Sequence, residues 1–188
     1  MNQAHSVICS SGWWARTVER NLLPWGLKGV DLGEDVLEIG PGFGATTRVL
    51  ARRKGSLTVV ELSESYCERL RRTLDGDVEI VQADATDMPF ADSRFSGVVC
   101  FTMLHHVPSP ELQDRLLSEV SRVLRPGGVF AGTDNLGTGL AFTALHARDT
   151  LVPVDPDGLP ARLEQAGLIE PRVDVSGRSF RFRARKVG

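Results

Sequence analysis

Short apolar runs alternate with amphipathic stretches over the first two thirds of the chain. The apolar runs start near residues 36, 57, 78 and 97, and they have the length and β-branched content of buried strands. Because strands and helices alternate evenly, the pattern predicts a parallel sheet with right-handed crossovers and helices on both faces. The fold class is therefore α/β, with a doubly wound, Rossmann-like, mostly parallel sheet.

The same pattern places the individual elements. Strands are expected at residues 36–39, 57–61, 78–82, 97–101 and 129–133, and helices at 13–23, 46–54, 64–75, 110–124 and 159–166, with a short one near 142–148. Pro24 should end the first helix, Gly76 the third and Gly167 the last. Residues 125–128, Arg-Pro-Gly-Gly, should stop the long helix and turn the chain into the fifth strand.

Bulky apolar residues recur at helical spacing before the first strand. Trp14, Val18, Leu22 and Trp25 fall on one face of the predicted helix. The simpler interpretation is that this face packs on the edge of the domain. The alternative is a lid over a ligand crevice, with Trp13, Trp14 or Trp25 touching the ligand. The two interpretations are compatible.

The end of the chain predicts a closing antiparallel β-hairpin, made of residues 172–175 and 179–185 around Ser176-Gly177. In its second strand three apolar residues alternate with three arginines, which indicates one buried and one wet face. The apolar set is Phe180, Phe182 and Ala184, and the cationic set is Arg181, Arg183 and Arg185. The formal net charge of −2 favours a solvated arginine face and argues against nucleic acid as a partner.

Length and composition fit one globular domain. The chain has 188 residues with 41% hydrophobic content, enough for a sizeable core. Three scattered cysteines without a CxxC pair suggest neither a disulfide framework nor a zinc site, and they are typical of a reducing cytosol. No long apolar run or basic leader is visible, so we expect a cytoplasmic protein with no membrane attachment.

Residues 35–50 predict a strand, a glycine-rich turn and a helix. Gly40, Gly42 and Gly44 have no Cβ, so the chain can turn sharply and a ligand can lie against its backbone. The amides of such a turn, next to a helix N-terminus, can receive a carboxylate. The spacing Gly40-x-Gly42-x-x-Ala45 also fits a dinucleotide-binding pattern, so the turn alone leaves the ligand open.

Acidic residues lie at the ends of three predicted strands, where ligands of open parallel sheets bind. These residues are Glu38, Glu61 and Asp84. Glu61 can accept both hydroxyls of a ribose, and Asp84 can accept from an exocyclic amine such as adenine N6. Glu38 can hold an ammonium group or order the glycine turn. The three acids therefore indicate a nucleoside site.

Two further strand ends carry polar groups. The fourth strand leads to Thr102, His105 and His106, and the fifth ends at Asp134-Asn135. Either histidine could serve as a general base. The simpler interpretation is that one packs in the loop while the other shapes the pocket. His146, further along, is a weaker candidate.

Taken together, these blocks resemble the class I S-adenosylmethionine-dependent methyltransferases of the small-molecule type. The matching blocks are residues 36–44, Glu61, residues 83–85 with 88–90, residues 104–107 and residues 124–128. The resemblance implies S-adenosylmethionine as the cofactor, S-adenosylhomocysteine as the product, and about seven strands with an antiparallel last hairpin. Cofactor contacts are then expected from Glu38, Gly40, Pro41, Gly42, Gly44, Glu61, Leu62, Asp84, Ala85 and Thr102.

The resemblance also implies an organisation and a reaction. It implies one methyltransferase domain, with a helical cap at 1–34, a cofactor-binding core at 35–134, and an acceptor segment with the closing hairpin at 135–188. The methyl group would pass to a small-molecule acceptor by in-line displacement, with His106 or His105 as base where the acceptor must lose a proton. We expect a monomer or homodimer.

Two alternatives and one metal question stay open at this point. Metal-dependent catechol-type relatives carry an Asp-Asn pair like Asp134-Asn135, but they also need an acid after the fourth strand, where this chain has Thr102-Met103. We therefore expect no metal. The alternatives are a non-catalytic S-adenosylmethionine- or S-adenosylhomocysteine-binding regulatory module and, less favoured, an NAD(P)-binding Rossmann protein.

Overall fold

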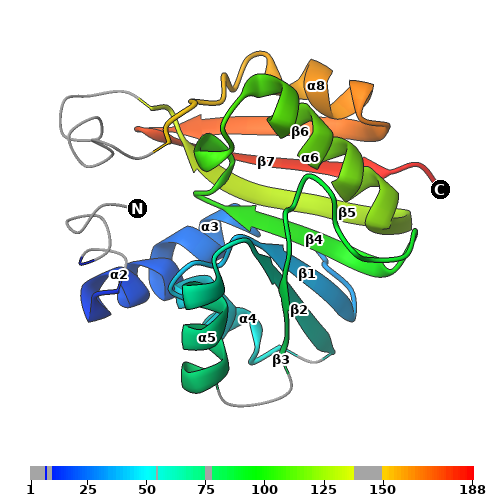
Figure 1. Ribbon diagram of the computed structural model, residues 1–188. Helices are drawn as coiled ribbons and strands as arrows, with labels where there is room; N and C mark the ends of the chain where they lie inside the picture. The colour runs from blue at the N-terminus through cyan, green and yellow to red at the C-terminus, as the bar shows by residue number, and fades with distance from the viewer. Residues whose placement is uncertain (1–6, 8–9, 54, 75–77, 138–149) are drawn as a thin grey trace.

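The described residues of the computed structural model, 7, 10–53, 55–74, 78–137 and 150–188, form one seven-stranded sheet (Figure 1). The strands are β1 (Asp35–Ile39), β2 (Ser56–Glu61), β3 (Val78–Gln82), β4 (Phe95–Phe101), β5 (Leu124–Asn135), β6 (Leu168–Ser176) and β7 (Ser179–Lys186). Their order is β3-β2-β1-β4-β5-β7-β6. The first five strands run parallel, and β7 is antiparallel to both β5 and β6. The expected fold class and the antiparallel closing hairpin are confirmed.

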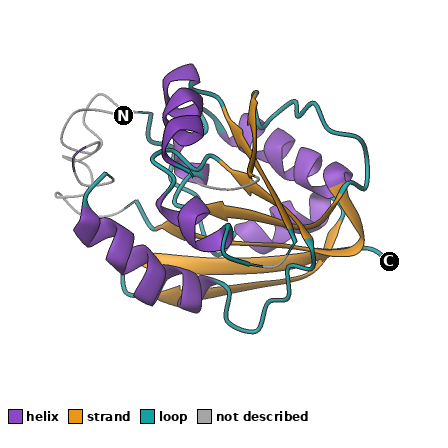
Figure 2. Cartoon of the chain, turned by 90° about the horizontal axis from the view of Figure 1, so that it is seen from below, coloured by secondary structure: helices purple, strands orange, loops and turns teal. Residues whose placement is uncertain are grey.

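Helices cover both faces of the sheet (Figure 2). One core cluster joins the sheet to α6 (Pro110–Val123) and α8 (Leu159–Gln165). The other joins it to α4 (Ala45–Leu50), α5 (Glu64–Thr73) and the N-terminal helical segment. Successive residues of a strand belong to alternate clusters: Leu37 and Ile39 lie in the first and Val36 in the second. This alternation is the physical reason why the central strands β1, β2 and β4 are apolar almost throughout.

The N-terminal segment is longer than the sequence pattern predicts. It consists of α2 (Gly12–Thr17), a π-helical turn η1 (Val18–Leu22) and α3 (Leu23–Gly26), and Ser11 caps it by accepting from the Trp14 N–H. The expectation that Pro24 ends the helix is wrong. Pro24 lies in the first turn of α3, after the wider turn in which the Leu23 N–H donates to the Val18 carbonyl, and there a missing N–H costs little.

Other boundaries move for similar reasons. Residues 125–128 do not form a separate turn, because β5 already starts at Leu124, which pairs with Phe95 across a bulge. The helix α4 ends at Leu50 instead of continuing to residue 54. In the hairpin, β6 starts at Leu168 rather than at residue 172.

Several predictions fall on parts of the chain outside the described residues. They concern Cys9, Gly76, His146 and the short helix near 142–148. The thiols of Cys67 and Cys100 are buried and free. In the described part of the chain, no helix combines the length and apolarity needed to cross a membrane.

Candidate functional site

A cavity opens beyond the carboxyl ends of β1, β2 and β4, the edge at which the parallel strands of Figure 1 end. Its volume is about 600 Å³, which suits a cofactor-sized molecule. The predicted cofactor-binding residues that line it are Gly40, Pro41, Gly42, Glu61, Leu62, Asp84, Ala85 and Thr102. Glu38 and Gly44 lie behind this lining. The structure therefore brings these eight predicted residues, which span 62 positions of the sequence from Gly40 to Thr102, into one cavity.

The glycine turn between β1 and α4 exposes its backbone to the cavity. Gly42 has a φ of +53°, and no atom lies within 4 Å of the point that a Cβ would occupy. Gly44 has a φ of +74° and caps α4, and a Cβ there would lie 2.6 Å from the Leu70 side chain. Glycine is therefore required at Gly44 for packing, whereas at Gly42 it leaves space in which a ligand can lie against the chain.

Glu61 is buried at the end of β2 with both carboxylate oxygens held by backbone donors. Its Oε2 accepts from the Gly42 N–H at 3.1 Å, and its Oε1 accepts from the Ser63 N–H at 2.9 Å. Each carboxylate oxygen has a further lone pair. The carboxylate is thus fixed in one orientation and can accept two hydroxyl groups from a ligand.

Asp84 lies in the loop that follows β3. Its Oδ1 accepts from the Thr86 N–H at 2.8 Å, and its carbonyl accepts from the Asp87 N–H at 3.0 Å. These two bonds fold the loop back so that Asp84 and Ala85 face the cavity. A carboxylate oriented in this way can accept from an amine of the ligand.

Glu38 is almost completely buried and contacts the start of α4, because its carboxylate accepts from the Thr46 hydroxyl. Burial raises the pKa of Glu38 to about 7. The hydrogen bond from Thr46 acts in the opposite direction, and the charge of Glu61 raises the pKa further. Of its two expected roles, the geometry supports the ordering of the glycine turn and its helix.

The two adjacent histidines point to different places. His106 lines the cavity, and its Nδ1 lies 3.1 Å from the Thr150 carbonyl oxygen. A carbonyl can only accept, so Nδ1 donates and the neutral ring carries its lone pair on Nε2. His105 is buried instead, and both its backbone N–H and its Nδ1 contact the carboxylate of Asp134.

The turn that carries these histidines, η2 (Leu104–His106), is fastened to α6 and to the chain after residue 149. The Gln113 side-chain amide donates to the Leu104 carbonyl at 3.1 Å and to the Val152 carbonyl at 2.9 Å. The Val152 N–H donates to the His105 carbonyl at 2.8 Å. The turn that ends at His106 is therefore held both by α6 and by the chain after residue 149.

Thr102, just before this turn, has a strained backbone. Its φ is +50°, a region that β-branched residues rarely adopt. Its N–H donates to the Thr133 carbonyl at 2.7 Å, which continues the pairing of β4 with β5. Strain of this kind costs on the order of 1–3 kcal/mol and concentrates at functional sites. Its place at the cavity agrees with that tendency.

Sequence reasoning missed an aromatic wall of the cavity. The rings of Phe43 and Tyr66 lie 5.1 Å apart, both line the cavity, and the Arg69 guanidinium lies 5.0 Å from the Phe43 ring. The sequence pattern gave no site role to Tyr66. Its position five residues after Glu61, in the first turn of α5, was the available signal.

The tryptophans of the N-terminal segment support both interpretations of it, packing on the domain edge and covering the ligand site. Trp14 lines the cavity, as the lid interpretation expects. Trp13 is 65% exposed, and Trp25 packs beside Arg181 with the guanidinium 5.9 Å from its ring. The segment therefore packs on the domain edge and also contributes one side chain to the site.

In the described part of the chain, no three His, Cys, Asp or Glu side chains lie close enough together to hold a metal ion. Asp134 is fully buried and contacts His105, while the Asn135 side chain accepts from the Ser179 hydroxyl at 3.0 Å. Neither residue lines the cavity.

Comparison with known proteins identifies the family of this chain. The family described as "Methyltransferase domain" matches residues 37–132. Demethylmenaquinone methyltransferase of Clavibacter sepedonicus is 40% identical over 98 residues, which cover 51% of this chain and 39% of that protein. The chain spans about two fifths of the length of the first curated relatives it matches.

Solved structures give the same picture at the level of the fold. A methyltransferase in complex with the Haloferax volcanii Trm112 activator superposes with a TM-score of 0.74 at 15% identity, over 100% of this chain and 99% of that one. An N-methyltransferase of Haemonchus contortus, in complex with phosphomonomethylethanolamine and S-adenosylhomocysteine, has a TM-score of 0.69 at 19% identity, over 84% of this chain and 50% of that one.

Proposed function

The chain belongs to the class I S-adenosylmethionine-dependent methyltransferases, and we propose that it transfers the methyl group of S-adenosylmethionine to a small-molecule acceptor. The observation that carries the proposal is Glu61. Its carboxylate is held in one orientation by two backbone donors, and it lines a cofactor-sized cavity together with the glycine turn.

The lining of the cavity fits each part of the cofactor. Glu61 has acceptors for the two ribose hydroxyls, and Asp84 has one for the adenine amine. The open backbone at Gly42 leaves room for the amino-acid portion. Phe43 and Tyr66 supply an apolar surface beside these polar groups. When bound, the cofactor supplies an electrophilic sulfonium methyl group.

The chain's own contribution to the reaction is then orientation and, where the acceptor is protonated, removal of a proton. Because the methyl donor is already activated, positioning accounts for most of the catalysis. We assign the role of proton acceptor to Nε2 of His106, which carries the lone pair when Nδ1 donates to Thr150. His105 and Asp134 do not line the cavity, and they act as a positioning pair that holds the turn.

The acceptor side of the cavity favours an apolar or aromatic molecule. Its lining includes Trp14, Met103, Val107 and Leu112. The curated relatives include proteins named as a demethylmenaquinone methyltransferase and a fatty-acid O-methyltransferase, and also one named as a sarcosine/dimethylglycine N-methyltransferase. We propose that residues 1–26, the turn with His105 and His106, and residues 135–155 form the acceptor side, next to the cofactor-binding core at 35–134.

Calorimetric titration with S-adenosylhomocysteine tests the proposal. We expect micromolar binding to the unaltered chain and no binding of NADH. Each charge-assisted hydrogen bond to a carboxylate is worth about 1.5–3 kcal/mol, so Glu61→Ala should weaken binding by at least roughly tenfold. Glu64→Ala removes the same charge from an exposed position three residues away and should leave the affinity within about twofold.

A thermal unfolding curve for each variant separates loss of the site from loss of the fold. Equal affinity of Glu61→Ala and the unaltered chain would overturn the assignment of Glu61 to the ribose. Binding of NADH in place of S-adenosylhomocysteine would overturn the methyltransferase function itself.

A further inference from the structure

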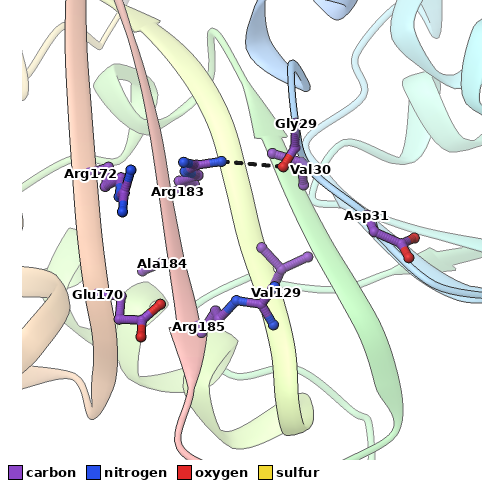
Figure 3. A pocket seen from close by; sticks show the side chains of 9 residues that line it. All are labelled: Gly29, Val30, Asp31, Val129, Glu170, Arg172, Arg183, Ala184 and Arg185. Carbon is purple, nitrogen blue, oxygen red and sulfur yellow. Dashed lines mark hydrogen bonds between the residues drawn. The ribbon is translucent and has the colours of Figure 1, made fainter.

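A second hollow of about 200 Å³ lies on the sheet face away from α6 and α8. Three arginines from β6 and β7 surround it, Arg172, Arg183 and Arg185, and the backbone at Gly29 and the side chain of Val129 close its other side (Figure 3). It shares no lining residue with the cofactor-sized cavity. A ligand in this hollow therefore contacts none of the residues that line the cofactor-sized cavity.

The register of the β6–β7 hairpin places like charges opposite each other at this hollow. Arg181 lies opposite Asp174, and the two form an ion pair at 2.9 Å. One pair further along the same face, Arg183 lies opposite Arg172. Directly opposed like charges destabilise a sheet. The pair of Arg172 and Arg183 therefore lacks the opposite charge that Asp174 supplies to Arg181.

Backbone carbonyls orient the arginines without neutralising them. Arg183 donates to the Gly29 carbonyl at 3.2 Å, a bond that Figure 3 shows, and Arg185 donates to the Gly127 carbonyl at 3.2 Å. None of the three arginines has an ion-pair partner among the side chains that the structure describes. Each guanidinium has five N–H donors, so most donors around the hollow remain available.

Two carboxylates also line the hollow and limit what it can hold. A bulge in β6, where Glu170 has a φ of +53°, places Glu170 at the rim. Asp31 lies at the other end, where its Oδ1 accepts from the Gly33 N–H at 3.0 Å. These acids would repel an extended polyanion such as nucleic acid. A compact anion that reaches mainly the guanidinium groups meets less of this repulsion.

We propose that this hollow binds one phosphate group, free or as a phosphomonoester. Guanidinium groups match the oxygens of phosphate with pairs of parallel N–H donors, and a doubly charged tetrahedral ion can use donors from more than one arginine at once. A bound phosphate supplies the counter-charge that the opposed Arg172 and Arg183 lack. It also links β7 to the residue 29–31 segment, because Arg183 already contacts Gly29.

Thermal unfolding in rising phosphate at constant ionic strength, with sodium chloride as the balancing salt, tests the proposal. A ligand that binds the folded state raises the unfolding midpoint by mass action. We expect a saturable rise with inorganic phosphate and no rise with chloride alone. Glycerol 3-phosphate in a parallel titration distinguishes the phosphomonoester from the free ion, because the tighter of the two identifies the preferred source.

Two variants should change phosphate affinity in opposite directions, and a third serves as the control. Arg172→Gln should weaken phosphate binding at least roughly tenfold, yet in chloride alone it should melt about 1–3 °C higher because the like-charge pair is gone. Glu170→Gln should tighten phosphate binding severalfold, since it removes a repelling carboxylate. Arg178→Gln, an exposed arginine outside the hollow, controls for net charge and should change neither value.

A midpoint that follows ionic strength alone, or identical phosphate titrations for all four proteins, would overturn the proposal. Titration of Arg172→Gln with S-adenosylhomocysteine keeps this test separate from the proposed methyl transfer. Its affinity should equal that of the unaltered chain, because the two sites share no residue.

Discussion

Replacement of Glu38 by Gln should stabilise the protein at neutral pH while leaving its stability nearly unchanged in mild acid. Glu38 is the buried carboxyl at the end of β1, and burial raises its pKa from 4.5 to about 7. A difference of this size between the unfolded and folded pKa is worth about 3 kcal/mol, at about 1.4 kcal/mol per unit. The amide of Gln has nearly the shape of the protonated carboxyl, and its oxygen can still accept from Thr46.

The sign follows from where each state releases the proton. Below pH 4.5 the Glu38 carboxyl is protonated in both states. Between pH 4.5 and about 7 the unfolded chain loses the proton and the folded chain keeps it, so the unfolding free energy falls as the pH rises. Above about pH 7 the full loss of about 3 kcal/mol has been reached. The Gln variant has no such group and escapes this loss.

Urea unfolding at several pH values, followed by tryptophan fluorescence, measures the difference. The unfolding free energy of Glu38→Gln minus that of the unaltered chain should grow by about 3 kcal/mol between pH 4.5 and 8. Thr46→Val removes a hydrogen bond that lowers the Glu38 pKa, so it should extend the loss to higher pH. Glu34→Gln, at an exposed position, controls for net charge. Parallel pH curves for Glu38→Gln and the unaltered chain would refute the reasoning.

Two more substitutions test the packing around the site. A Cβ at Gly132 would lie 1.9 Å from the Cys100 carbonyl oxygen in the neighbouring strand, so Gly132→Ala should prevent cooperative folding, as circular dichroism would show. Gly42→Ala, where space is open, should fold with a loss of only about 1 kcal/mol, and equal stability of the two variants would contradict the steric argument. Arg122→Lys should lower the unfolding free energy by about 1–3 kcal/mol and increase hydrogen exchange in residues 83–94. The reason is that the Arg122 guanidinium donates to the Phe90 carbonyl at 2.6 Å, and a single ammonium cannot make all the bonds of the guanidinium. Unchanged exchange in residues 83–94 would show that Arg122 does not hold this loop.

The central strands β1, β2, β4 and β5 were predictable because they are buried on both faces, so that apolar runs of strand length stand out in the sequence. The wrong boundary predictions occur where a local sequence signal is overridden by the surrounding structure. Pro24 is a local breaker, but the π-helical turn before it lets the helix continue. Residues 125–128 read locally as a turn, but Leu124 already pairs with Phe95 in the neighbouring strand. Local propensity cannot show which strand a residue will pair with.

The candidate site was predictable where it depends on topology alone. Parallel strands end at the same edge, so Glu61 and Asp84 were expected to meet, and both line the cavity. His105 and His106 show the limit. They are neighbours in the sequence, and the difference between a buried residue and one at the cavity is set by Asp134, 29 residues away. Composition and spacing carry no signal for that contact.

The arginines of β7 are a second case in which the sequence predicts the residues but not their surroundings. Alternation with Phe182 predicted a wet face, and the short turn after Ser176 fixes the register that sets Arg172 opposite Arg183. A row of solvated arginines would repel itself and bind nothing. What makes this row a candidate site is the hollow, and its opposite wall comes from Gly29, more than 150 positions earlier in the chain. The arginines themselves could be predicted from the sequence. The hollow that would make them selective for a compact anion could not, because it forms only when the chain is folded.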